Sequence, residues 1–313
     1  MTKTCLVTIG ITAFREGAWL VECWESVLAQ TDDRWQAVVI LDGGADEETL
    51  RIFEGLSHPR LEKYAFSENV GPYPARNKAF ELTTTPYHFY LDADDLLAPD
   101  AVKNILGAFE AFPRAGFVYG DIELFGGQSG FWRYAKDVSA DDFVRSQPLP
   151  GGGCAYALNS WKAVGGFSEE LSRGNGDYDF HIALCEAGIS GVHCGSILYH
   201  LRMSNAPRVS SSYRLSYYKT HELMIARHPN FFSDSVRRRL FLGHALYRSA
   251  VANYLADEFT TARKLALRAR ENGVNDMTLT LIVSLGLLPA SINRVVLRSG
   301  RFLKSMLMGT LRG

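Results

Sequence analysis

The sequence predicts an α/β fold, in which a largely parallel sheet has helices on both faces and a helical extension follows at the C-terminal side. Two observations support this prediction. Strand-like and helix-like segments alternate from residue 5 to about residue 120, which is typical of parallel sheets. The strand-like segments are also continuous apolar runs, as strands buried on both faces require. With 313 residues, 47% of them apolar, the chain is long enough for about two domains.

The N-terminal elements follow one another in a regular order. Apolar runs over Leu6–Ile11 and Gln36–Leu41 predict two strands, and apolar residues at helical spacing between Leu20 and Leu28 predict the helix that joins them. The elements predicted next are a helix over Asp46–Leu56, a strand over Leu61–Ala65, a helix over Pro74–Leu82, a strand over Tyr87–Leu91 and a helix over Pro99–Phe112. Each strand is thus followed by a helix, as in a parallel sheet.

The middle of the chain has a looser pattern. Glycine-rich turns and aromatic strands fill residues 116–215, where Asp177–Ala187 is the one clear helix. Loop-rich segments of this kind often carry binding functions. Residues 235–272 return to helical spacing and predict a pair of helices packed through small and large side chains.

Charge is distributed unevenly along the chain. Residues 1–230 contain 20 Lys and Arg against 29 Asp and Glu, whereas residues 231–313 contain 13 against 5. The basic segment could attract an anionic membrane. It lacks the interleaved aromatic and basic residues of a surface that stacks bases, so no nucleic-acid partner is predicted.

The cysteines and the N-terminal residues bear on the compartment. The five cysteines are odd in number and show no Cys-x-x-Cys spacing, which argues against a disulfide framework and a structural zinc site. The first residues lead directly into a strand, without the pattern of a signal peptide, and no apolar stretch reaches the ~18 residues of a membrane span. We therefore expect a cytoplasmic location, with peripheral contact to the inner face of the membrane as an alternative.

Acidic residues follow two of the predicted strands directly. Asp42 ends one apolar run, and Asp92, Asp94 and Asp95 end another. The carboxyl ends of strands in open α/β sheets are where ligands bind, and carboxylates gathered there repel one another unless a cation is present. Oxygen ligands favour Mg²⁺ or Mn²⁺. For Asp95, a solvated turn or a helix N-cap is an equally simple interpretation.

Five motifs occur in an order that resembles the family 2 glycosyltransferases with the GT-A fold, over roughly residues 5–205. They are Val-Thr-Ile-Gly-Ile-Thr-Ala-Phe-Arg-Glu, Leu-Asp-Gly-Gly-Ala-Asp-Glu-Glu-Thr, Asn69-Val-Gly71 with Ala75-Arg76-Asn77-Lys78-Ala79, Leu-Asp92-Ala-Asp94-Asp95, and Val164-Gly-Gly-Phe-Ser-Glu-Glu-Leu with Gly176-Asp177-Tyr178-Asp179. The resemblance implies a GT-A domain over residues 1–230, with a nucleotide-sugar half (1–120) and an acceptor half (121–230), followed by a helical, basic region over residues 231–313.

The resemblance also implies roles for individual residues. By position, the nucleotide-sugar site would include Thr12 and Asp42 at the nucleobase, Ala13 and Phe14 beside them, Arg76 near the base or diphosphate, and Asp92 at the ribose and sugar. Asp94 would bind Mg²⁺ or Mn²⁺, and Asp177 would be the catalytic base. The implied reaction is an inverting, metal-assisted single displacement from a nucleotide-diphosphate donor, with UDP favoured, to a hydroxyl of a glycan or lipid-linked glycan. The Gln-x-x-Arg-Trp signature of processive synthases is absent, which favours single addition.

The sequence departs from the family pattern at three positions. Gly176 stands where an acid is expected before the base, Arg15 replaces Asn in the opening loop, and Ala45 replaces a hydroxyl residue. These departures leave Asp179 as a second candidate for the base, although an acid in the first turn of a helix is also favoured by the helix dipole alone.

Two histidines are further candidates for the metal site. His193 and His200 flank the predicted strand Gly195–Tyr199, so either could approach the ion from a loop. A lone histidine is more often structural, and both interpretations stay open.

Two other functions remain open at this stage. A catalytically degenerate nucleotide-sugar-binding or scaffold protein is compatible with Gly176. A sugar nucleotidyltransferase would share the architecture, but this sequence lacks the basic, glycine-rich phosphate loop that such an enzyme needs.

At the C-terminal side, residues 293–308 sort into a basic and an apolar face. Residues 277–313 are therefore predicted to contact a membrane peripherally, unless the apolar face packs on its own domain.

Overall fold

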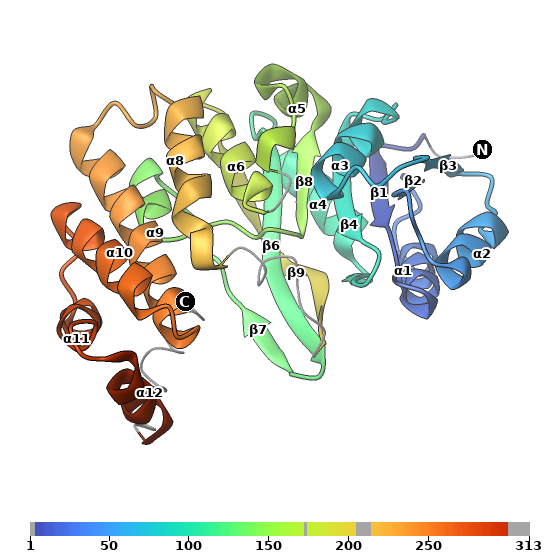
Figure 1. Cartoon of the computed structure of the whole chain (residues 1–313). Coiled ribbons are helices and arrows are strands. Elements are labelled where there is room, and N and C mark those ends of the chain that lie inside the picture. Colours follow the sequence, from blue (N-terminus) through green and yellow to red (C-terminus); the bar gives the residue numbers. More distant parts are fainter. Residues whose placement is uncertain (1–3, 172–173, 205–213, 300–313) are drawn as a thin grey trace. The chain divides into compact units, whose positions relative to one another are not determined.

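The computed structural model describes residues 4–171, 174–204 and 214–299. The chain forms two compact units, shown in Figure 1. The sheet unit comprises Met1–Val138, Pro148–Ser172 and Gly176–Ala206, and the helical unit comprises Ser139–Gln147, Arg173–Asn175 and Pro207–Gly313. The main boundary between them therefore lies near residue 206, earlier than the predicted domain boundary at residue 230.

A nine-stranded mixed sheet forms the centre of the described part of the sheet unit, in the order β3-β2-β1-β4-β8-β6-β9-β5, with β7 beside β6. The strands are β1 (Val7–Ala13), β2 (Trp35–Leu41), β3 (Leu61–Ala65), β4 (Tyr87–Asp92), β5 (Leu96–Leu97), β6 (Phe117–Gly126), β7 (Gly130–Trp132), β8 (Cys154–Ala157) and β9 (Gly191–Met203). The first four in spatial order pair in parallel, as predicted. The sheet then changes direction, because β8 is antiparallel to both β4 and β6.

Helices cover both faces of this sheet (Figure 1). They are α1 (Ala18–Leu28), α2 (Glu47–Gly55), α3 (Pro72–Glu81), α4 (Ala101–Ala111), α5 (Leu158–Val164) and α6 (Gly176–Glu186). Alternate residues of β2 point to opposite faces: Val39 joins the core formed with α1 and α4, and Val38 packs with Ala75 and Ala79 of α3. The prediction of a sheet covered on both sides is confirmed.

Local sequence determines where the helices that frame the site begin. The Asp46 side chain accepts a hydrogen bond from the Thr49 backbone N–H at 2.8 Å and so caps α2. Helix α3 begins after Gly71, whose φ of 86° favours glycine, and Pro72 occupies a first-turn position where no N–H is needed.

One predicted strand differs from the structure. Strand β9 spans Gly191–Met203 rather than Gly195–Tyr199, so His193 and His200 lie inside the strand and not in flanking loops. The prediction that either histidine approaches from a loop is therefore wrong. Gly195 interrupts the apolar pattern and has a φ of 75°, and the pairing of β9 with β6 shifts register on both sides of Asp121. The strand continues through this irregularity because β6 is itself long.

The helical unit contains α8 (Tyr217–Arg227), α9 (Ser235–Leu255), α10 (Phe259–Glu271), α11 (Met277–Leu285) and α12 (Ala290–Ser299). The predicted pair over residues 235–272 is confirmed as α9 and α10. These two helices bury a shared core of Leu246, Ala250, Tyr254, Ala262, Leu265 and Ala266.

The start of α12 is anchored to this unit by a polar side chain. Asn293 is fully buried, donates to the carbonyls of Leu285 and Leu288, and accepts a hydrogen bond from Tyr254 Oη at 2.8 Å. Val295, by contrast, is 63% exposed. The remainder of the predicted amphipathic segment, residues 300–308, lies outside the described residues. Among the helices that the structure describes, none is both long and apolar enough to cross a bilayer.

Candidate active site

Strands β1 and β4 bring two predicted site residues together at their carboxyl ends. The parallel register pairs Thr12 with Asp92, and Thr12 Oγ1 donates to Asp92 Oδ1 at 3.3 Å. Strand β2 ends at the same edge of the sheet, next to β1, and Asp42 follows it directly. This edge is therefore where the predicted nucleotide-sugar residues meet.

Arg76 reaches the same edge from α3. Its Nη2 donates to Oδ1 and Oδ2 of Asp92 at 2.8 and 2.9 Å, and the residue is only 7% exposed. Burial alone would lower the pKa of the guanidinium, but the charge of Asp92 outweighs it and the pKa is raised. Arg76 Nε is buried without a hydrogen-bond partner among the described residues. A guanidinium with an unused N–H can donate a further hydrogen bond to an anionic or carbonyl oxygen that reaches it.

Asp42 is used as a hydrogen-bond acceptor by the backbone. Its Oδ1 accepts from the N–H groups of Gly43 and Val70 at 2.9 and 2.7 Å, and its Oδ2 accepts from Gly71 N–H at 2.9 Å. The carboxylate therefore holds the loop that leads into α3, which carries Arg76. A carboxylate has about four acceptor positions, so contact with a nucleobase stays a prediction alongside this structural role.

The loop after β1 is joined to the loop after β2. Asp42 N–H donates to Ala13 O at 2.8 Å, and Arg15 donates through Nε and Nη2 to Gly44 O at 3.0 and 2.9 Å. The Arg15 guanidinium lies 4.7 Å from the centre of the Phe14 ring. Arg15, one of the departures from the family pattern, thus fixes Phe14 beside the edge of the sheet.

Asp94 and Asp95 have different surroundings in the turn after β4. Asp95 is 2% exposed and accepts from Tyr199 Oη and from Arg202 N–H, both at 2.6 Å. Burial, followed by the charge of Asp94, raises the pKa of Asp95 to about 8. Asp95 is thus neither a solvated turn residue nor a helix cap, because it joins this turn to β9. Asp94 is half-buried, and its carbonyl accepts from Arg202 Nε at 2.8 Å.

Sequence reasoning missed Glu16 as a member of this site. Its Oε2 accepts from Phe14 N–H at 2.5 Å in the loop after β1. Burial raises the pKa of Glu16 to about 7, the Phe14 hydrogen bond opposes this shift, and the charges of Asp94 and Asp92 add to it. Three carboxylates are thus close enough to influence one another. The available signal was an acid in the loop after a strand, but Glu16 lies three residues beyond the end of β1 and so does not stand at a strand end.

The acids fit a hard cation only in part. The described residues contain no group of three His, Cys, Asp or Glu side chains arranged as metal ligands. Asp94 nevertheless offers carboxylate oxygen beside two further acids, and Mg²⁺ commonly binds one or two carboxylates together with water and phosphate oxygens. The donor set therefore suits an ion that arrives with a phosphorylated ligand.

The two candidate histidines have other partners on β6. His193 Nε2 lies 3.2 Å from Asp121 Oδ1, and its Nδ1 accepts from Gly195 N–H at 2.9 Å. His200 Nδ1 lies 2.9 Å from Glu123 Oε2. Both ring nitrogens of His193 are thus engaged, which favours a structural role for it, whereas metal binding by His200 stays a prediction.

Helix α3 also connects this edge with the segment that precedes α6. Asn77 exchanges hydrogen bonds of 2.9 Å with both the N–H and the carbonyl of Phe167, in the Gly-Gly-Phe segment. Asp177 and Asp179 lie in the first turn of α6, where Asp179 is 1% exposed. The role of either acid as the base stays a prediction.

The fold and the candidate site agree with a known protein family. The family model described as glycosyl transferase family 2 matches residues 8–168, about half of the chain. The chain belongs to glycosyl transferase family 2. The matched residues include Thr12, Asp42, Arg76, Asp92 and Asp94 and end shortly before α6. The predicted family and the enzyme class, a glycosyltransferase, are confirmed.

Several curated proteins are similar to this family 2 chain. Chondroitin synthase of Escherichia coli is 30% identical over 204 residues, which cover 64% of this chain and 29% of that protein. Chondroitin synthase of Pasteurella multocida is 26% identical over 263 residues, or 81% of this chain and 24% of that protein. Teichoic acid poly(glycerol phosphate) polymerase of Staphylococcus epidermidis is 30% identical over 105 residues, or 33% and 15%. The chain thus spans less than a third of the length of these relatives.

Solved structures share the fold at low sequence identity. The crystal structure of S. aureus TarS 1-349 in complex with UDP-GlcNAc has a TM-score of 0.70 and 15% identity, covering 95% of this chain and 93% of that chain. The mannosyltransferase PcManGT from Pyrobaculum calidifontis, in complex with GDP-Man and Mn²⁺, has a TM-score of 0.54 and 17% identity, covering 99% and 86%. The predicted GT-A fold with C-terminal helices is confirmed.

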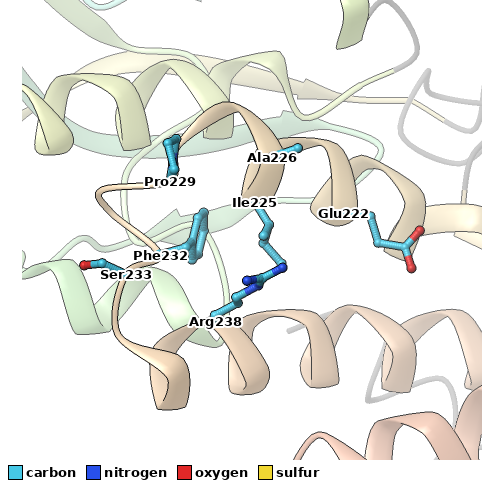
Figure 2. A pocket seen from close by; sticks show the side chains of 7 residues that line it. All are labelled: Glu222, Ile225, Ala226, Pro229, Phe232, Ser233 and Arg238. Carbon is cyan, nitrogen blue, oxygen red and sulfur yellow. The ribbon is translucent and has the colours of Figure 1, made fainter.

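The helical unit of this family 2 protein contains a pocket of about 420 Å³, shown in Figure 2. The side chains of Ile225, Phe232 and Arg238 converge in the space between α8 and α9. The other lining residues are Glu222, Ala226, Pro229 and Ser233. No predicted site residue contributes to this pocket, so the strand edge with Asp92 and Arg76, rather than this hollow, is the candidate active site.

Proposed function

We propose that the chain transfers a sugar from a nucleotide-diphosphate donor to an acceptor hydroxyl of a glycan or lipid-linked glycan, in a single inverting displacement. The observation that carries this proposal is the cluster at the carboxyl ends of β1 and β4, where Asp92 binds both Thr12 and the buried Arg76. The family match supports a nucleotide sugar as the donor. The complexes of similar folds with UDP-GlcNAc and GDP-Man agree with this donor class.

On this proposal, the strand edge binds the nucleotide. Thr12, Ala13, Phe14 and Asp42 surround the base, and Asp92 accepts hydrogen bonds from the ribose or sugar hydroxyls. Arg76 offers a planar cation to the base or diphosphate. UDP is the proposed nucleotide, supported by the likeness to the TarS complex with UDP-GlcNAc.

Mg²⁺ or Mn²⁺ would be held by Asp94, with Glu16 and Asp92 nearby and His200 as a further candidate. When bound, the ion supplies neutralisation of the charge on the departing diphosphate. Asp177, with Asp179 as the second candidate, would remove the proton of the acceptor hydroxyl as it attacks. The attack forms the new glycosidic bond, breaks the bond from the anomeric carbon to the diphosphate, and transfers the hydroxyl proton to the carboxylate.

One observation favours a second function. Gly176 stands where the family motif has an acid, which would suit a protein that binds nucleotide sugars without transferring them. On that alternative, UDP binding would persist while no sugar moved. The two functions therefore differ in turnover and not in donor binding.

Mass spectrometry of acceptor glycans incubated with a panel of nucleotide sugars and Mn²⁺ tests the proposal. We expect a mass increase of one sugar, abolished by EDTA and by Asp177→Asn, with UDP binding by calorimetry retained in that variant. Asp137→Asn, an exposed acid of the same unit, is the matched control. UDP binding with neither hydrolysis nor transfer would support the binding protein instead, and release of pyrophosphate would indicate a nucleotidyltransferase.

We also propose that residues 277–313 attach the protein peripherally to an anionic membrane, on the cytoplasmic side. The support is compositional: this segment contains five basic residues and no acidic residue. Attachment would bring the enzyme to a lipid-linked acceptor.

A further inference from the structure

Gly176 opens α6, and a tyrosine fills the space beside it. A Cβ atom at residue 176 would lie 2.6 Å from Cζ of Tyr73 and 2.7 Å from both Cε atoms. These distances are far shorter than van der Waals contact, so only glycine fits here while Tyr73 keeps its position. The ring meets the helix with its phenol end, one residue before Asp177.

Tyr73 is held in place from several sides. It lies in the first turn of α3, is 5% exposed, and stacks on Phe167 with ring centres 6.0 Å apart and an interplanar angle of 20°. The guanidinium of Arg76 lies 5.6 Å from the centre of its ring. Phe167 is in turn fixed to α3 by Asn77. The ring therefore has little freedom to move independently of α3.

The same ring connects two parts of the candidate site. On one side lies Arg76, which binds Asp92, and on the other lies the backbone of Gly176. Burial raises the pKa of Tyr73, and the charge of Asp177 raises it further, against opposing effects of Arg76 and the Gly176 N–H. The phenol is thus neutral at ordinary pH and adds no charge beside Asp177.

We propose that Tyr73 is a positioning residue for the transfer reaction. Its phenol end fixes the position of the first turn of α6, and therefore of Asp177, relative to the Arg76–Asp92 pair. The inference rests on the proposed function and on the role proposed there for Asp177. It gives Gly176 a physical reason: the aromatic ring occupies the volume that an acidic side chain would need. On this proposal, Gly176 is part of an active site in which Tyr73 fills the space of the acidic side chain, and it is not a sign of lost catalysis.

The proposal predicts how substitutions at the two positions combine. Tyr73→Leu replaces the ring with a shorter side chain, and Gly176→Ala pushes the Tyr73 ring away from α6. Each substitution should lower kcat about tenfold or more, because small displacements of catalytic groups slow the reaction strongly. The double variant Tyr73→Leu/Gly176→Ala should lose less than the product of the single effects, since the added methyl no longer meets the ring. Tyr73→Phe keeps the ring and should stay within about threefold of wild type.

Three measurements separate positioning from general damage. The melting temperature shows that each variant is folded, and calorimetry with UDP and Mn²⁺ should give a dissociation constant within about threefold of wild type. Hydrogen exchange of the amides at residues 176–180 should accelerate in Tyr73→Leu, because the first turn of α6 loses its support. Tyr64→Leu, a tyrosine of β3 that is 37% exposed, is the control and should change none of these values.

The hydrogen-exchange measurement does not require activity, so it separates this proposal from the proposed function. If exchange at 176–180 is unchanged in folded Tyr73→Leu, or if its kcat stays within about twofold of wild type, Tyr73 does not position α6 and the inference is wrong. A parallel loss of UDP affinity would also overturn it, because Tyr73 would then act on the donor. If Asp177→Asn transfers sugar at the wild-type rate, the assignment of the base fails, whatever Tyr73 does.

Discussion

The sheet unit and the helical unit differ most in charge. The sheet unit has 14 Lys and Arg against 26 Asp and Glu, and the helical unit has 19 against 8, so their formal charges are −12 and +11. The net charge of the whole chain, −1, hides this difference. The contrast between the units is also sharper than the one found by dividing the sequence at residue 230, because residues 207–230 are basic and belong to the helical unit.

The opposite charges of the two units predict different partners for them. In the sheet unit, burial raises the pKa of Glu16, and the charges of Asp94 and Asp92 raise it further, so the three carboxylates repel one another. A cation would relieve that repulsion. In the helical unit the excess is positive, so anionic partners are attracted and salt weakens the attraction. Metal removal should therefore act on the sheet unit, and ionic strength on the helical unit.

Loss of Asp94 should have the largest effect. We expect Asp94→Ala to lower sugar transfer about 1000-fold, and EDTA to do the same to the wild type, because the charge of the leaving group is no longer neutralised. Product formation measured by mass spectrometry tests this, with Asp137→Ala, an exposed acid of the same unit, as the control. If transfer stays at the wild-type rate both in Asp94→Ala and in EDTA, the metal role is rejected. The sheet unit would then not require a cation, and this difference between the two units would disappear.

Replacing Arg76 should have the next largest effect. Arg76→Met leaves Asp92 without its cation at 2.8 Å, and we expect about a 100-fold loss of kcat/KM and up to about 3 kcal/mol of unfolding free energy. Asp92→Asn added to Arg76→Met should restore part of the stability but none of the activity. Arg34→Met, which removes the guanidinium of a side chain that is 30% exposed from its pair with Asp32, should cost less than about 1 kcal/mol. Equal stability losses in Arg76→Met and Arg34→Met would contradict this account of the buried Arg76 guanidinium.

Much of the fold could be predicted from the sequence because short-range patterns determine it. The bounds of β3, Leu61–Ala65, agree with the prediction, and the alternation of strands and helices predicts the parallel half of the sheet. Strand β9 was predicted too short because Gly195 interrupts its apolar pattern, and only pairing with β6 shows that the strand continues. Antiparallel β8 was not foreseen, since its four residues carry too little pattern.

The acidic residues of the candidate site were predictable from their place at or just after a strand end, whereas Thr12 and Arg76 were predictable only from the order of the family motifs. Asp42, Asp92 and Asp94 satisfy that rule, and the structure places Asp92 with Thr12 and Arg76. Tyr73 and Arg202 were missed because their importance depends on neighbours about 100 residues or more away, Gly176 and Asp95 respectively. No local pattern encodes such contacts. The local sequence around Asp95 is that of an ordinary acidic turn, and only its contacts with Tyr199 and Arg202 of β9 distinguish it.

Buried histidines give a way to compare the units in acid. Burial lowers the pKa of His181 in the sheet unit and of His221 in the helical unit from 6.5 to about 3. Between these values the unfolded chain binds a proton that the folded chain excludes, so stability is complete above pH 6.5 and falls as the pH decreases towards 3. Each histidine should contribute up to about 1.4 kcal/mol per pH unit to this slope.

His181→Gln and His221→Gln should each reduce the slope of unfolding free energy with pH by up to about one proton, measured by urea unfolding between pH 4 and pH 7. If the units unfold together, the two reductions will appear in a single transition. If they unfold separately, each variant will change only one of two transitions. A slope that neither substitution changes would show that neither histidine is buried in its neutral form.

The smallest expected effect concerns the membrane and the basic unit. Full-length protein should float with anionic vesicles at low salt and not at high salt, because the attraction fades within a Debye length. Arg294 is exposed on α12 and lies 3.3 Å from Asp257, so Arg294→Gln removes one positive charge and leaves that acid unbalanced. We expect about a fivefold weaker partition, equivalent to about 1 kcal/mol. Arg51→Gln, an exposed change in the acidic unit, should leave partition unchanged. If both substitutions weaken binding equally, the attraction follows total charge and not the helical unit, and the contrast between the units would have no bearing on membrane contact.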